Sequence, residues 1–170
     1  MNYIDLTLLI ILGGFVLAGL WFGVIHMIGS LVGVLFGAFC AGHFYTQAAD
    51  FITPLVGGNE NLAKLLAFFG IFILVNRLIG LIFHVIEKIF RLIAVIPFFK
   101  TFNRLLGAIL GLIEGTLVLG LAVYFSARFP FSAAFSATLL ESSLAKALNL
   151  VGAILAPLLP DAIRALQSIL

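Results

Sequence analysis

Apolar residues run through this chain in long stretches that short polar segments separate. Each of four stretches approaches the roughly 20 residues that a helix needs to cross a bilayer. The clearest break is the polar segment from Gln47 to Leu62, where Pro54 and the Gly57-Gly58 pair favour turns. The pattern predicts an all-α, multi-pass membrane protein with four spans, at about residues 4–22, 24–45, 65–85 and 104–125.

Small residues recur at every fourth position in two of the predicted spans. On an α-helix this spacing drifts by only about 40° per step, so the residues form one stripe. In lipid, such a stripe lets another helix come very close. The second span carries the stripe Gly29, Gly33, Gly37 and Ala41, and the fourth span carries Gly107, Gly111 and Gly115. The stripes predict tight helix packing, either within one chain or between copies in a homo-oligomer.

Two ionisable residues fall inside the predicted spans. Arg77 lies in the third span and Glu114 in the fourth, and an antiparallel hairpin of these spans would bring them to one depth. A charge at that depth costs at least about 2.5 kcal/mol on insertion scales. We therefore predict an Arg77–Glu114 ion pair that fixes the helix register, so that neutralising either residue destabilises the fold. The alternative is a polar lining for a pore or a proton-linked site.

Basic residues gather between the third and fourth spans. A helix over about residues 84–96 has a basic face opposite an apolar one, which is typical of a segment lying in the membrane interface. Pro97 is expected to end it, and Asn103 is expected to cap the fourth span. The basic segment Lys88–Arg104 is predicted to be cytoplasmic and is a candidate docking surface for a protein partner.

With four spans, that orientation places the N-terminus and the C-terminal tail outside. The residues before the first span include no basic side chain, so we expect a retained span instead of a cleaved signal. The membrane domain is expected over residues 1–125. The tail, residues 126–170, is predicted to form short amphipathic helices that lie in the interface or pack back on the spans; a fifth span or re-entrant element is the alternative.

Composition agrees with lipid as the solvent. Of 170 residues, 64% are hydrophobic and 9% are charged, whereas soluble domains are about 45–50% apolar and about 25% charged. The net charge of +2 is too small to indicate nucleic-acid binding. One cysteine and three scattered histidines offer no metal-ligand spacing, so no metal or cofactor is expected. No Walker loop, HExxH or GxSxG motif occurs, and an enzyme is not expected.

The arrangement of several residues in this sequence resembles the pattern of a known family. Asp5 opens the first span in Tyr3-Ile4-Asp5, the second span is rich in glycine, and NRLLGAILGLIEG opens the fourth with Asn103 and Arg104 before the glycines Gly107, Gly111 and Gly115. This array is similar to the colicin V production protein family (CvpA) of bacterial inner-membrane proteins. Two departures are the lack of a basic residue directly after the first span, where only His26 is near, and Glu114 at a position that is often basic in the family.

The resemblance implies a role in colicin V production and release and in envelope maintenance, at the bacterial inner membrane, with no established catalytic chemistry. Two interpretations follow. The first is an oligomeric, non-enzymatic scaffold that packs through its glycine stripes. The second is a small channel or transporter subunit, also oligomeric, whose pathway runs past Arg77, Glu114 and polar neighbours such as Asn76.

Overall fold

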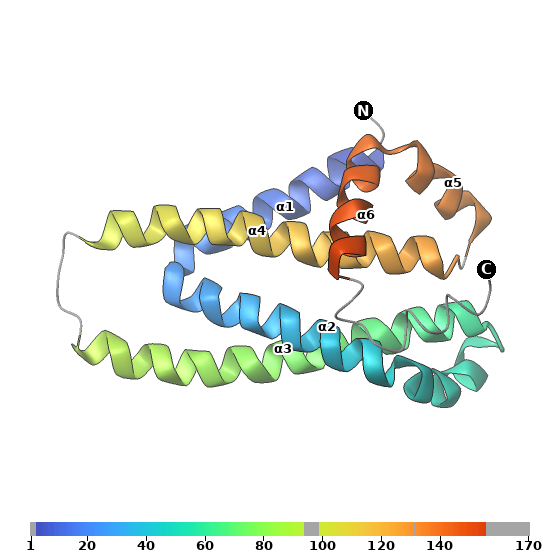
Figure 1. Ribbon diagram of the computed structural model, residues 1–170, viewed down its shortest axis with the longest axis horizontal. Coiled ribbons are helices and arrows are strands. Elements are labelled where there is room, and N and C mark those ends of the chain that lie inside the picture. The colour runs from blue at the N-terminus through green and yellow to red at the C-terminus, as the bar shows by residue number, and fades with distance from the viewer. Residues whose placement is uncertain (1–2, 94–98, 131, 156–170) are drawn as a thin grey trace.

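The structure, a computed structural model, describes residues 3–93, 99–130 and 132–155 (Figure 1). Every regular element among them is helical: α1 (Tyr3–Phe22), α2 (Val24–Ile52), the short 3₁₀ turn η1 (Thr53–Val56), α3 (Glu60–Ile93), α4 (Phe99–Arg128), α5 (Ala133–Glu141) and α6 (Ser143–Leu155). The four long helices are apolar enough to cross a membrane. The predicted all-α, multi-pass fold is confirmed.

The long helices do not pack in chain order. α1 packs on α4, α4 packs on α2, and α2 packs on α3. Figure 1 shows α2 lying between α4 and α3. The third and fourth helices, which are consecutive in the chain, are therefore separated by α2 instead of forming a closely packed hairpin.

The helices extend beyond the predicted spans. α2 continues to Ile52, so the polar break begins only at η1. α3 runs without a break from Glu60 to Ile93. The interfacial segment, which was predicted to continue the helix of the third span, belongs to α3 as far as Ile93, and its last residues, 94–96, lie outside the described residues together with Pro97.

The expectation that Asn103 caps the fourth span is wrong, because α4 begins at Phe99 and Asn103 lies inside it. The Asn103 side chain instead accepts a hydrogen bond of 3.1 Å from the backbone N–H of Val24, the first residue of α2. The preceding residue, Gly23, adopts a φ of 83° and has no side chain to cap the helix. Asn103 supplies the missing acceptor for one of the free N–H groups at this helix start.

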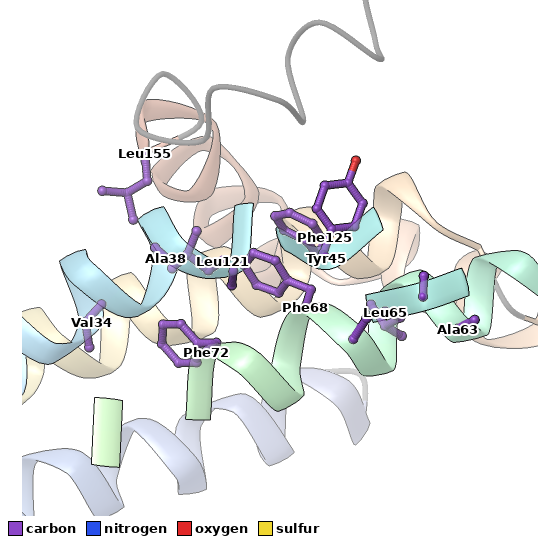
Figure 2. Packing of buried hydrophobic residues seen from close by; sticks show 13 residues of the cluster. Val34, Ala38, Tyr45, Ala63, Leu65, Phe68, Phe72, Leu121, Phe125 and Leu155 are labelled. Atoms are coloured by element: carbon purple, nitrogen blue, oxygen red, sulfur yellow. The ribbon is translucent and has the colours of Figure 1, made fainter. Parts of the chain in front are cut away.

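One half of the bundle, on the side of η1, is filled by aromatic rings (Figure 2). Phe68 of α3 stacks on Phe125 of α4 with ring centroids 3.5 Å apart, and Tyr45 of α2 meets Phe125 edge-on at 6.0 Å. All three side chains are almost completely buried. We call this cluster the aromatic core; it bridges the distance between α3 and α4.

The described part of the tail packs back on the spans. α5 and α6 meet at a bend of 94°, and α6 runs across α4 in Figure 1. Close approach is possible because Gly152 of α6 lies directly against the backbone of Gly120 in α4. The short helix expected near the C-terminus falls within residues 156–170, outside the described residues.

Candidate functional site: a polar groove at membrane depth

A groove of about 970 Å³ lies between α1 and α3, on the other half of the bundle from the aromatic core. Its floor is formed by α2 and α4, which contribute Ser30 and Glu114 among other residues. Its walls are Phe15, Ala18 and Phe22 of α1 and the stretch of α3 from Phe72 to His84. At 1.5 Å per residue, that stretch is roughly 18 Å long, about half of a bilayer's apolar thickness.

The groove exists because α2 holds α3 and α4 apart. The α2 glycines draw α3 against α2: a Cβ at Gly37 would come within 3.0 Å of the carbonyl oxygen of Phe72. In the aromatic core, large rings fill the remaining distance between α3 and α4. Phe72 is the last such ring, since it belongs to the same buried cluster and also lines the groove. Beyond it α3 contributes Asn76 and Arg77 to the groove lining instead of further rings.

Glu114 is the most unusual residue of the groove. Its side chain is only 4% exposed. One carboxylate oxygen, Oε1, accepts a hydrogen bond from the Ser30 hydroxyl. The other, Oε2, is buried and has no hydrogen-bond partner in the described parts of the chain. A buried acceptor without a donor costs roughly 1–3 kcal/mol, and more when the group is charged.

Arg77 lines the same groove but does not bond to Glu114. Its residue is exposed, whereas Glu114 is buried. The structure therefore brings the two predicted residues to one groove without joining them in an ion pair. The physical reason is the helix order: the expected α3–α4 hairpin is not closely packed, and α2 places Ser30 against the carboxylate instead.

Three further polar side chains line the groove: Asn76, His26 and His84. The amide oxygen of Asn76 lies directly over Gly33, in the place that a side chain there would take. His26 stacks on Phe22 with ring centroids 4.5 Å apart. Asn76 was expected beside the pathway of the channel interpretation, whereas the histidines were assigned to no site and Ser30 was not predicted. A lone hydroxyl inside an apolar span was the only signal for Ser30.

Both glycine stripes contact helices of the same chain. Gly29, Gly33 and Gly37 face α3, where they meet Phe83, Asn76 and Phe72 respectively. Ala41 is fully buried in the core.

The stripe on α4 faces α1. Gly107 lies against the backbone of Gly19 and Gly23, Gly111 against the carbonyl of Phe15, and Gly115 against the Phe15 side chain. These positions are occupied within the chain, so the stripes themselves leave little surface for a second copy.

Asp5 anchors the start of α6 to the start of α1. It is 8% exposed, and its Oδ1 accepts hydrogen bonds from the Ser142 hydroxyl and from the backbone N–H of Leu144, the latter at 3.1 Å. The Ser142 oxygen in turn accepts from the N–H of Ala145 at 3.0 Å. An acidic side chain at a helix N-terminus is stabilising, so this pair caps α6.

The basic end of the bundle lies near the Gly23 turn. Lys88 and Arg104 are exposed there. Arg91 and Lys100 belong to α3 and α4, but their side chains lie outside the described part. Within the described residues, no three histidine, cysteine or acidic side chains come together in a way that could hold a metal ion.

One comparison with known proteins gives a match. A family model described as "Colicin V production protein" matches residues 4–153. The matched range begins in α1, includes all four long helices and α5, and ends within α6. No curated protein and no solved structure matches the chain.

Proposed function

Because this chain belongs to the colicin V production protein family, we propose that it is a non-enzymatic inner-membrane protein that serves colicin V production and release and envelope maintenance. The family description supports the colicin V role. The absence of a catalytic motif from the sequence supports the non-enzymatic role. The exposed basic residues Lys88 and Arg104 support an orientation in which this end of the bundle is cytoplasmic and both the N-terminus and the tail are outside.

We further propose that the protein works as a channel or transporter subunit whose binding site is the groove. The observation that carries this proposal is the buried Glu114, which has one unpartnered carboxylate oxygen at the floor of an open groove within the membrane. Ionisable groups at this depth are costly and mark ligand or ion pathways. The aromatic core closes the other half, so the groove has the form of a one-sided vestibule.

The test is a colicin V release assay in a producing strain that lacks its own family member. We expect the wild-type chain to restore release and Glu114→Gln to reduce it by at least about tenfold, the effect of losing one charged hydrogen bond. Arg77→Gln should reduce release as well. The matched control is Glu60→Gln, a change of an exposed carboxylate whose pairing with Lys64 is of the weak surface kind. Full release with Glu114→Gln at wild-type protein level would contradict the proposal.

An oligomeric scaffold is the second candidate function. The exposed basic ends of α3 and α4 favour it, since they offer a surface for a cytoplasmic partner. The glycine stripes no longer argue for it, because each one meets a helix of its own chain. Native mass spectrometry in nanodiscs tests the channel. Four spans leave little room for a pore, so a channel requires a symmetric oligomer. A ring of defined subunit number would support the channel, and a strict monomer would remove it.

A further inference from the structure

The groove floor contains a hydrogen-bond acceptor that lacks a donor. The Oε2 atom of Glu114 has no partner in the described parts of the chain, and the neighbouring Ser30 hydroxyl already donates its proton to Oε1. The amide oxygen of Asn76, which also lines the groove, packs over Gly33 of α2. A ligand that pairs with Oε2 supplies an N–H donor, and a positive charge on that donor strengthens the hydrogen bond. A primary ammonium group, with three donors on one compact charge, has this chemistry.

Hydrogen-bond donors that suit a phosphate lie along the α3 wall of the same groove. Arg77 and His84 both line it. The Arg77 guanidinium is positively charged and its fork of N–H groups suits a phosphate particularly well, and the His84 ring carries an N–H in either tautomer. One groove thus offers an acidic floor and a basic wall. A molecule that carries an ammonium and a phosphate a few atoms apart complements both.

The remaining surface of the groove is apolar and faces lipid. Phe15, Ala18 and Phe22 form one wall, and Ile73, Leu78 and Leu81 alternate with the polar residues of the other. α1 and α3 do not pack against each other along this opening. A headgroup can therefore enter from the side while its acyl chains stay in the bilayer or along the apolar walls.

We propose that the groove binds an aminophospholipid of the phosphatidylethanolamine class, with its ammonium on Glu114 and its phosphate on Arg77 and His84. This inference rests on the proposed function, which makes the groove the working site, and names the class of molecule held there. Basic side chains in pockets between membrane helices bind the phosphates of lipid headgroups, which is the part that Arg77 would play here. Phosphatidylcholine is the informative comparison, because it keeps the charges and the acyl chains but has no N–H donor.

The experiment measures lipid binding to the purified full-length chain by native mass spectrometry, with phosphatidylethanolamine, phosphatidylcholine and phosphatidylglycerol of identical acyl chains. We expect phosphatidylethanolamine to bind about tenfold tighter than phosphatidylcholine, as one charged hydrogen bond requires. Glu114→Gln should bring the two within twofold. Arg77→Gln should weaken both equally and preserve their ratio, and the control Glu60→Gln should change neither.

The comparison of lipids on the wild-type chain needs no variant, so it stands even where Glu114→Gln fails to fold. Equal binding of phosphatidylethanolamine and phosphatidylcholine would overturn the inference, as would tighter binding of phosphatidylglycerol. Displacement of the lipid by free ethanolamine at equal concentration would show a soluble amine site and would also overturn it. If these results appear while colicin V release still depends on Glu114, the inference fails and the proposed function stands.

Discussion

The two halves of this bundle differ in what occupies the space between α3 and α4. On the side of η1, the rings of Tyr45, Phe68 and Phe125 fill the distance between α3 and α4. On the side of the Gly23 turn, Asn76, Arg77 and Glu114 line a groove instead. The two halves therefore differ in the side chains that line the space beside α2.

Under the proposed function, the aromatic core serves stability and the groove serves ligand binding. Burial in lipid gives apolar side chains little hydrophobic gain, so close contacts and hydrogen bonds hold membrane helices together. The aromatic core and the glycine contacts supply those contacts. The groove lacks such contacts, and the buried Oε2 atom of Glu114 has no hydrogen-bond partner in the described parts of the chain. We therefore expect substitutions in the core to act on stability and substitutions in the groove to act on ligand binding and release.

The largest effect on stability is expected where helix backbones touch. A Cβ at Gly19 would meet the backbone of Gly107, which cannot move aside, so Gly19→Leu should separate α1 from α4 and lower the free energy of unfolding by about 3 kcal/mol. Gly13→Leu is the matched control on the same helix, because nothing lies within 4 Å of its Cβ. Equilibrium unfolding in mixed micelles measures both; equal stability of the two variants would refute the α1–α4 contact.

The next largest effect is expected from the aromatic core. Phe125→Ala leaves a cavity beside Phe68 and Tyr45, and we expect it to lower the free energy of unfolding by about 2 kcal/mol. This is below the roughly 3–5 kcal/mol typical of water-soluble cores, because moving a side chain out of lipid contributes less than moving it out of water. Phe36 is 57% exposed, so Phe36→Ala should change the unfolding free energy by less than about 0.5 kcal/mol. A similar loss for both variants would mean that the rings do not hold this half together.

A smaller effect is expected at the cap of α6. Asp5→Asn keeps an oxygen acceptor for Ser142 and Leu144 but removes the charge. We therefore expect the free energy of unfolding to fall by about 1 kcal/mol, a usual value for a charge at a helix N-terminus. Asp50→Asn, at an exposed site, serves as the control. Hydrogen exchange of the α6 amides should rise in Asp5→Asn alone; unchanged protection would show that the charge does not hold α6.

The smallest effect on stability is expected at Arg77. An ion pair with Glu114 would make Arg77→Gln strongly destabilising, but the structure shows no such pair. We expect Arg77→Gln to change the free energy of unfolding by less than about 0.5 kcal/mol, because the side chain is exposed. Reversing both charges together should not restore the stability lost by reversing one of them. A loss of several kcal/mol, restored by the double reversal, would favour the ion pair that the sequence suggested.

Much of this fold was predictable from the sequence, because long apolar runs leave few alternatives in lipid. The four spans and the importance of the glycine stripes followed from hydropathy and spacing. The helix that each stripe contacts could not be predicted, because glycine at every fourth position indicates a packing face but not which helix packs there. The insertion of α2 between α3 and α4 is a property of the whole bundle, and the expected Arg77–Glu114 pair depended on the wrong helix order.

The candidate site was predictable only in part. Glu114 and Arg77 stood out because charges inside spans are expensive. Asn76 was expected beside them, but Ser30 was not predicted, because a small polar side chain is tolerated at many places in membrane helices. Asp5 and Asn103 were expected at helix ends near the interface, and both in fact act on a helix other than their own. A cap supplied by another helix leaves no trace in the local sequence.

The central claim is that the groove between α1 and α3 is the working part of the protein, and a matched glycine pair tests it most directly. Gly80 lines the groove and Gly70 does not, yet both lie on α3 and neither has an atom within 4 Å of its Cβ position. Gly80→Leu adds a bulky side chain to a residue of the groove lining at a position where its Cβ meets no atom, and Gly70→Leu adds the same side chain elsewhere. We expect the colicin V release assay to show a large loss for Gly80→Leu and wild-type release for Gly70→Leu, at equal protein levels. Equal release by the two variants would contradict the account.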